Sequence, residues 1–162
     1  MEMFAQRARE LVAQMTLEEK VSQMRYDAPA IERLGIPAYN WWNECLHGVG
    51  RSGTATVFPQ PIGMAASFDE SLMEHVAQAI SDEARAKYNQ YKTFGETGIY
   101  QGLTFWSPNI NLFRDPRWGR GHETYGEDPL LTGRMGTAFI RGLQEGKDPK
   151  YRKLDATVKH FA

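Results

Sequence analysis

The architecture of this chain is indicated by one segment, GLTFWSPNINLFRDPRWGRGHETYGEDP, residues 102–129. Its first five residues, GLTFW, predict a β-strand. Residues 107–129 hold three arginines, four acidic residues, three prolines and three glycines, which excludes an ordinary helix or a central strand for most of this segment. Because aromatic residues accompany these charges, we expect an ordered surface loop whose polar groups face a ligand. Asp128 and Pro129 then predict the cap and the first residue of a helix.

Further strands and helices are expected on both sides of this segment. AYNWW at 38–42 and DATVKHF at 155–161 predict two more strands. Helices are predicted over 2–14, from residue 16 to about 24, from 67 to about 88, and from 129 to 143. Two pairs fit capping boxes, Thr16 with Glu19 and Ser67 with Glu70. The buried stripe expected for the helix after Ser67 consists of Leu72, Val76, Ile80 and Ala84.

This order of elements indicates an α/β fold. Strands separated by helices are typical of parallel β/α units, and both an open doubly wound sheet and an eight-unit barrel are built from them. The loops after the strands are long and polar, which favours the barrel, whose sites lie at the carboxyl ends of its strands. A (β/α)₈ barrel has about 250 residues, and only three strands are evident here. We therefore expect the first part of a parallel β/α barrel of the TIM-barrel type, with N-terminal helices in 1–26, the first barrel strands and helices in 27–162, and the remainder in a longer parent chain.

Composition and motifs argue against several classes of function. The 19 basic and 20 acidic residues give a net charge of −1, so nothing indicates a nucleic-acid partner or a charged membrane surface. No apolar run approaches the roughly 20 residues that span a bilayer. Cys45 is the single cysteine, and the four histidines lack metal-ligand spacing, so we expect no disulfide and no metal. GRGHETYG lacks the third glycine of a dinucleotide-binding loop, and no phosphate-binding or Gly-x-Ser-x-Gly motif is present.

Polar residues follow each of the three strands. These are Asn43, Glu44 and His47 after the first, Ser107, Asn109, Arg114, Asp115, Arg117 and Arg120 after the second, and Lys159 and His160 at the end of the third. In a parallel barrel they converge on one face, with aromatic walls from Trp41, Trp42, Trp106 and Trp118. Such a pocket suits a neutral, hydroxyl-rich ligand, because charged groups bind vicinal hydroxyls and aromatic faces pack against a sugar ring.

A structural interpretation competes with this one. Arg114, Asp115 and Arg117 fit an ion-pair network that holds the loop equally well. The residues that fit loop, capping or structural roles better than functional ones are Glu123, Glu127, Asp128, His47 and His122. Lys159 differs, since a lysine that points into a buried mouth is costly without a partner or ligand. Lys159 and His160 therefore favour function.

Five ordered segments, WNECLHGV, ATVFPQPIGMAASFD, AISDEARAKYN, LTFWSPNINLFRDPRWGRGHETYGEDP and ATVKHFA, resemble the N-terminal barrel domain of family 3 glycoside hydrolases. They are most similar to its β-xylosidase-like branch. The resemblance runs from MTLEEKVSQM to the last residue. It implies a retaining, two-carboxylate hydrolysis of terminal non-reducing β-linked sugars, without metal or organic cofactor. It also implies export of the parent protein to the periplasm or the outside.

Matched residue by residue, the resemblance implies that Glu44, Arg120, Lys159 and His160 bind the sugar of the innermost subsite. The family's nucleophile and acid/base are expected beyond Ala162. The parent protein is then expected to hydrolyse β-linked xylo- or gluco-oligosaccharides, while this chain alone does not, because without the nucleophile no covalent intermediate forms. The alternative is a freestanding carbohydrate-binding or structural module without hydrolase activity.

Overall fold

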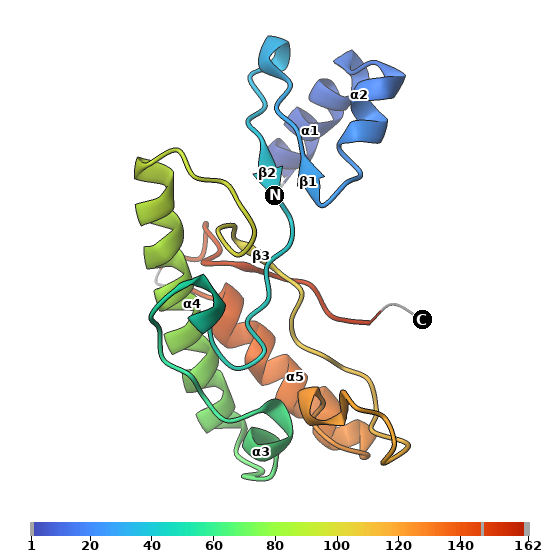
Figure 1. Ribbon diagram of the computed structural model, residues 1–162, viewed down its shortest axis with the longest axis vertical. Helices are drawn as coiled ribbons and strands as arrows, with labels where there is room; N and C mark the ends of the chain where they lie inside the picture. Colours follow the sequence, from blue (N-terminus) through green and yellow to red (C-terminus); the bar gives the residue numbers. More distant parts are fainter. Residues whose placement is uncertain (1, 147, 161–162) are drawn as a thin grey trace.

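The computed structural model describes residues 2–146 and 148–160. Figure 1 shows the helices and strands of residues 2–40 at one end of the molecule and two long helices, α4 (Glu70–Thr93) and α5 (Pro129–Gln144), side by side at the other, with strand β3 (Thr104–Phe105) near the middle. Between these parts the chain runs through extended segments and short 3₁₀ turns at Glu32–Leu34, Gly50–Ser52 and Gly121–Glu123. None of the helices in the described ranges is both long and apolar enough to cross a membrane.

The N-terminal part begins with helices α1 (Glu2–Gln14) and α2 (Leu17–Ser22), as predicted. The capping box of α2 is present: Glu19 N donates to Thr16 Oγ1 at 3.2 Å, and Thr16 N donates to Glu19 Oε2 at 2.8 Å. These reciprocal bonds satisfy backbone donors that the first turn of a helix leaves without partners. The helix therefore begins where the local sequence indicates.

The strand predicted at 38–42 has a different partner from the one expected. β2 (Tyr39–Asn40) pairs antiparallel with β1 (Asp27–Ala28), with Asp27 opposite Asn40. It ends early because the Asn40 side chain accepts a hydrogen bond from Trp42 N at 2.9 Å, which turns the chain. The interpretation of this segment as the first parallel strand was wrong.

Helix α4 (Glu70–Thr93) begins later and runs further than predicted. Its cap is Asp69, whose carboxylate accepts from Leu72 N at 2.9 Å, and not Ser67. Leu72, expected in the buried stripe, is 50% exposed, and Val76 is only partly buried. The buried stripe consists of Met73, Ala77, Ile80, Ser81 and Ala84. The stripe is displaced by one residue at its start, because the helix α5 (Pro129–Gln144) packs against that face.

The close approach of α4 and α5 is possible because Gly142 has no side chain. A Cβ atom at this position would lie 2.4 Å from the Glu74 carbonyl oxygen and 2.6 Å from Ala77 Cβ. Ser81 Oγ lies 3.0 Å from the Gly142 carbonyl oxygen across the same contact. Phe139 is fully buried in this core. As predicted, α5 is capped by Asp128, whose carboxylate accepts from Leu131 N at 2.6 Å, with Pro129 at its first position.

The second pair of strands is parallel, as the β/α pattern predicts. β3 (Thr104–Phe105) pairs with β4 (Asp155–Ala156), and α5 lies between them in the sequence. The pairing continues as a parallel bridge between Asn109 and Lys159. The last residue of the predicted strand, 161, lies outside the described residues. The fold is α/β, but the described strands form two two-stranded sheets and no closed barrel, so the TIM-barrel architecture stays a prediction.

Candidate functional site

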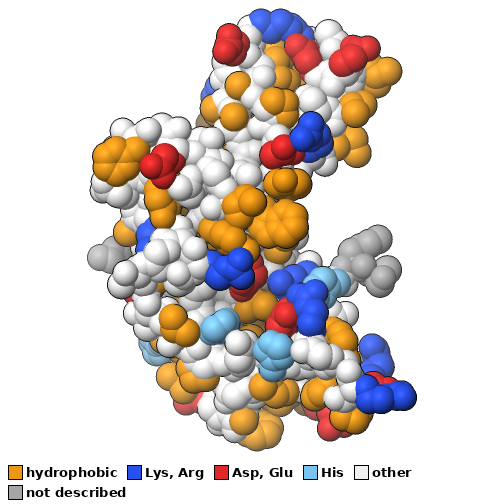
Figure 2. All heavy atoms as spheres, in the orientation of Figure 1, with side chains coloured by type: hydrophobic (Ala, Val, Ile, Leu, Met, Phe, Trp, Pro, Cys, Tyr) orange, Lys and Arg blue, Asp and Glu red, His pale blue; other side chains and the backbone are white. Residues whose placement is uncertain are grey.

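The segment after β3 lies between the two other polar clusters. On one side, Trp106 N donates to Asn43 O at 2.9 Å. On the other side, Ile110 N donates to Lys159 O at 2.8 Å and Lys159 N donates to Pro108 O at 3.0 Å. Glu44, which follows Asn43, is thereby brought to the same region as Lys159 and His160. On the face shown in Figure 2, basic, acidic and histidine side chains gather about halfway along the molecule, beside a group of hydrophobic ones.

Glu123 is the carboxylate that joins two of the cations. Arg120 binds it through two hydrogen bonds, Nε to Oε1 at 2.7 Å and Nη2 to Oε2 at 2.6 Å. Lys159 Nζ lies 4.0 Å from Oε2, and the side chains of Lys159 and Glu123 are each only 15% exposed. Sequence reasoning assigned Glu123 to the loop. Its position three residues after Arg120, on the 3₁₀ turn Gly121–Glu123, was the signal that could have identified it.

The charges at this cluster shift one another's pKa. The Arg120 guanidinium holds the pKa of Glu123 below its ordinary value, and Glu123 in turn raises the pKa of Arg120. Burial lowers the pKa of Lys159, although the negative charges of Glu44 and Glu123 oppose that shift. A cation that is desolvated in this way gains from a ligand that offers hydroxyl oxygens.

The ring of Phe113 packs closely against the backbone of the turn that carries Arg120 and Glu123. A Cβ atom at Gly121 would lie 2.3 Å from the ring of Phe113, so only glycine allows the ring to pack there. Phe113 N donates to Gly126 O at 2.9 Å and closes the loop from the other side. Such packing restricts the loop to one conformation. It supports the expectation of an ordered loop.

Short polar side chains at alternate positions connect this segment to the site residues. Ser107 Oγ accepts from Cys45 N at 3.0 Å, next to Glu44. Asn109 is fully buried, and its Nδ2 makes no hydrogen bond within the described part of the chain. Asn111 Oδ1 accepts from His160 N at 3.2 Å and lies 2.7 Å from His160 Nδ1. Asn111 was not a predicted site residue, although its alternation with Ser107 and Asn109 along an extended segment was visible in SPNIN.

Several residues with competing interpretations have structural partners. Arg117 donates two hydrogen bonds to Asp115, from Nε to Oδ1 at 3.0 Å and from Nη2 to Oδ2 at 2.6 Å, and the Arg117 side chain is 89% exposed. Arg114 makes no ion pair among residues 2–146 and 148–160, so the network holds for Asp115 and Arg117 only. His47 Nδ1 lies 2.9 Å from Phe58 O, as expected of a structural histidine. Glu44 accepts a hydrogen bond from Leu46 N.

The four tryptophans expected as aromatic walls do not form one surface. Trp42 and Trp106 lie together, with ring centroids 5.2 Å apart, and Trp106 N binds the residue before Glu44. Trp41 packs edge-on against Tyr39, and Trp118 packs near Phe113. The aromatic wall beside Glu44 is therefore built from Trp42 and Trp106.

One face of α4 holds the loop that follows Glu44. Glu83 accepts from Thr56 N and Oγ1, the latter at 2.7 Å, and Lys87 Nζ donates to Ser52 O and Thr54 O. Tyr91 OH lies 2.9 Å from Ser52 O. These helix residues, spaced four apart, lie on one face of the helix. Loop 50–57 is therefore attached to α4 by side-chain hydrogen bonds.

The family is established by comparison with known proteins. Residues 4–162 match the family described as the glycosyl hydrolase family 3 N terminal domain. The chain belongs to glycosyl hydrolase family 3. A xylan 1,4-beta-xylosidase of Xylanibacter ruminicola is 51% identical over 159 residues, which cover 97% of this chain and 18% of that protein. The probable beta-D-xylosidase 7 of Arabidopsis thaliana is 48% identical over 171 residues, which cover 96% of this chain and 21% of that protein.

Solved structures of the family agree with the fold of this chain. A GH3 exo-beta-xylosidase (XlnD) in complex with a xylobiose aziridine activity based probe matches with a TM-score of 0.80 and 38% identity, over 96% of this chain and 20% of that one. DesR, a beta-glucosidase from Streptomyces venezuelae in complex with D-glucose, matches with a TM-score of 0.72 and 32% identity, over 96% and 19%. This family 3 chain thus spans about a fifth of the length of these relatives.

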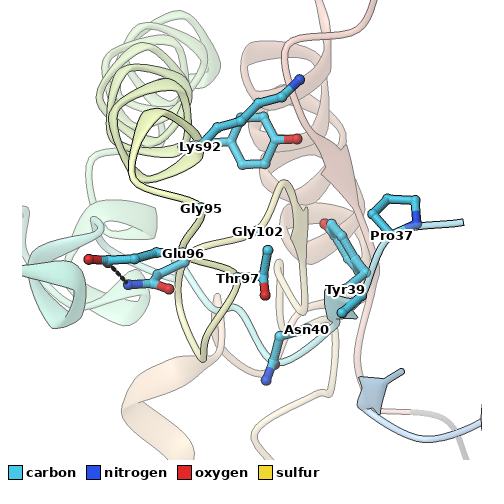
Figure 3. Close-up of a pocket in the computed structure, with 11 residues that line it drawn as sticks. Pro37, Tyr39, Asn40, Lys92, Gly95, Glu96, Thr97 and Gly102 are labelled. Atoms are coloured by element: carbon cyan, nitrogen blue, oxygen red, sulfur yellow. Dashed lines mark hydrogen bonds between the residues drawn. The ribbon is translucent and has the colours of Figure 1, made fainter. Parts of the chain in front are cut away.

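A separate cavity of about 210 Å³ lies between β2, the end of α4 and the loop that follows it. Figure 3 shows Pro37, Tyr39 and Asn40 on one side of it and Gly95, Glu96 and Thr97 on the other. It is lined mainly by apolar surface and contains none of the four predicted sugar-binding residues. In this family 3 chain the cavity is therefore distinct from the polar cluster. No group of three or more potential metal-binding side chains occurs in the described part of the chain.

Proposed function

We propose that this chain supplies the sugar-binding part of a β-xylosidase-like glycoside hydrolase. In this proposal the parent protein hydrolyses terminal non-reducing β-linked xylose or glucose residues with retention. The segment 27–162 forms the first strands and helices of its TIM barrel, after the helices of 1–26. The remainder of the parent chain completes the barrel.

The observation that carries the proposal is the meeting of three distant segments at one polar cluster. Backbone hydrogen bonds join the segment of Glu44 to Trp106 and the segment of Lys159 to Pro108 and Ile110. Arg120 approaches Lys159 through their common partner Glu123. Donors and acceptors from separate elements around a tryptophan pair suit a small polyhydroxylated ligand. The relatives named as xylosidases support xylose as the sugar.

The carboxylates of the cluster suit binding better than catalysis. A general acid in glycoside hydrolysis needs a raised pKa, whereas Arg120 lowers the pKa of Glu123. Glu44 accepts a hydrogen bond from Leu46 N, which suits a carboxylate held in place to accept from sugar hydroxyls. We therefore assign sugar binding to Glu44, Arg120, Lys159 and His160, and place the nucleophile and the acid/base in the rest of the parent protein.

The test is hydrolysis of aryl β-xyloside and β-glucoside by this chain and by the product of the full open reading frame that contains it. Hydrolysis by the long protein alone is the expected result. In that protein, Lys159→Met should lower kcat/KM by about 10- to 100-fold, because it removes a charged hydrogen bond worth roughly 1.5–3 kcal/mol. Arg117→Met, which removes an exposed loop cation, is the matched control and should change kcat/KM less than twofold.

Hydrolysis of either glycoside by the 162-residue chain alone would contradict the assignment of sugar binding to this chain and of the catalytic carboxylates to the rest of the parent protein. A frame that stops at Ala162, together with sugar binding by the short chain, would favour the alternative of a carbohydrate-binding module.

A further inference from the structure

The contact between Asn111 and His160 determines which ring nitrogen carries the proton. Asn111 Oδ1 accepts from the His160 backbone N at 3.2 Å. Because a backbone N–H can only donate, the oxygen of the amide must be the atom that faces His160. The same oxygen lies 2.7 Å from His160 Nδ1, so Nδ1 must also donate to it. The neutral ring consequently carries its proton on Nδ1.

A ring protonated on Nδ1 exposes a lone pair on Nε2. Within residues 2–146 and 148–160, Nε2 of His160 has no hydrogen-bond partner, and the residue is exposed. Burial of part of the ring and the positive charges of Arg120 and Lys159 lower the pKa of His160, against an opposing effect of Glu123. The neutral form therefore prevails at pH 7, since the ordinary histidine pKa is already about 6.5.

We propose that Asn111 is a positioning residue that holds His160 in the Nδ1–H tautomer, so that Nε2 accepts a hydrogen bond from a hydroxyl of the ligand. The ligand part of this inference rests on the proposed function. Lys159 and Arg120 can only donate hydrogen bonds, so each binds the oxygen atom of a ligand hydroxyl. Nε2 of His160 instead accepts a hydrogen bond from the O–H group of a ligand hydroxyl. The site then requires at least one ligand hydroxyl that donates, which a fluorine or an ether oxygen at the same carbon cannot do.

Long-range ¹H–¹⁵N NMR of the histidine rings in the 162-residue chain tests the tautomer. The expected spectrum at pH 7.5 shows His160 protonated on Nδ1, with unprotonated Nε2. His47 is a built-in control, because its Nδ1 faces a backbone carbonyl at 2.9 Å and must also donate. Asn111→Leu should release the preference of His160 and leave His47 unchanged. Asn111→Asp keeps an acceptor oxygen and should keep the tautomer.

Protonation of His160 on Nε2 in the unsubstituted chain would overturn the proposal, whether or not the parent protein hydrolyses glycosides. An unchanged His160 spectrum in the Asn111→Leu protein would overturn it as well. Asn111→Ala, which has a smaller side chain and also lacks an acceptor, provides a second variant with the same expected result if the leucine protein does not fold. Absence of any glycoside hydrolysis by the unsubstituted parent protein would instead contradict the proposed function.

Kinetics of the full parent protein test the role of Nε2. Among the singly deoxyfluorinated aryl β-xylosides, we expect at least one whose loss in kcat/KM relative to the hydroxyl substrate is at least tenfold and shrinks in the Asn111→Leu protein. A loss caused by the hydroxyl that donates to Glu44 should not change in that protein. As the pH falls through the lowered pKa of His160, Nε2 gains a proton and kcat/KM should fall. Asn111→Asp adds a negative charge beside the ring and should move this acidic limb upward by about one pH unit. The acceptor role of Nε2 would be overturned if kcat/KM fell equally for all substrates in the unsubstituted and the Asn111→Leu proteins. It would also be overturned if the acidic limb of the pH profile did not move in the Asn111→Asp protein.

Discussion

Replacing Gly142 with alanine is expected to destabilise the chain, although alanine favours helices. Its Cβ would lie 2.4 Å from the Glu74 carbonyl oxygen and 2.6 Å from Ala77 Cβ, whereas non-bonded carbon atoms rest roughly 3.5–4.0 Å apart. Helices α4 and α5 would have to separate by about 1 Å to relieve these contacts. That movement also weakens the contact between Ser81 Oγ and the Gly142 carbonyl oxygen, now 3.0 Å.

The change in unfolding free energy follows from two effects that destabilise the variant and one that stabilises it. Overpacking in a core costs about 1–3 kcal/mol, and loss of the Ser81 hydrogen bond costs about 1 kcal/mol. Alanine in place of glycine within a helix returns about 1 kcal/mol. The expected net loss of unfolding free energy for Gly142→Ala is therefore roughly 1–3 kcal/mol.

Urea unfolding followed by circular dichroism measures this loss. Gly133→Ala is the matched control, because Gly133 lies in the same helix with no atom within 4 Å of the added Cβ. That variant should gain about 0.5–1 kcal/mol from helix propensity alone. If Gly142→Ala were as stable as Gly133→Ala, the two helices would not approach as closely as described.

Three further outcomes are expected. In the parent protein, Glu123→Gln should lower kcat/KM for an aryl β-xyloside at least tenfold, because it frees the cations that Glu123 holds, while Asp115→Asn should leave it within twofold. Burial raises the pKa of the Cys45 thiol, so we expect no reaction with Ellman's reagent at pH 8 in the folded chain. In urea, one thiol per chain should react. Rapid reaction without urea would refute the burial of Cys45. Asp128→Ala removes the cap of α5 and should lower the unfolding free energy by about 1 kcal/mol in urea titrations, whereas an unchanged midpoint would show that the cap contributes nothing.

The elements that the sequence predicted well are those with local signals. The capping box of Thr16 and the Asp128–Pro129 start of α5 involve residues within one turn of each other, so tertiary structure changes them little. The start of α4 was misplaced because Ser67 and Asp69 are both good capping residues. Phe68 lies between them with a φ of +54°, a left-handed conformation that no sequence pattern indicated, and it prevents a helix from starting before Asp69.

For the candidate site, the sequence indicated that the segments of Glu44, Arg120 and Lys159 lie close together, but not the contacts that hold them. Parallel pairing of β3 with β4, which the β/α order predicted, brings the segments of Arg120 and Lys159 together, whereas the segment of Glu44 is joined to them by the hydrogen bond from Trp106 N to Asn43 O. The antiparallel partner of β2 and the contact of Asn111 with His160 depend on residues far apart in the chain, for which the sequence has no local signal. Glu123 was undervalued for a related reason, because its second partner, Lys159, is distant in the sequence.

The row formed by Glu83, Lys87 and Tyr91 on α4 has a consequence for engineering. Loop 50–57 follows Glu44 in the sequence, yet its polar contacts reach a helix more than 25 residues further along the chain. A loop transplanted from a relative would arrive without these partners. Grafts that also transfer the three helix residues should therefore keep the loop in place, whereas a graft of the loop alone exchanges its hydrogen bonds for water.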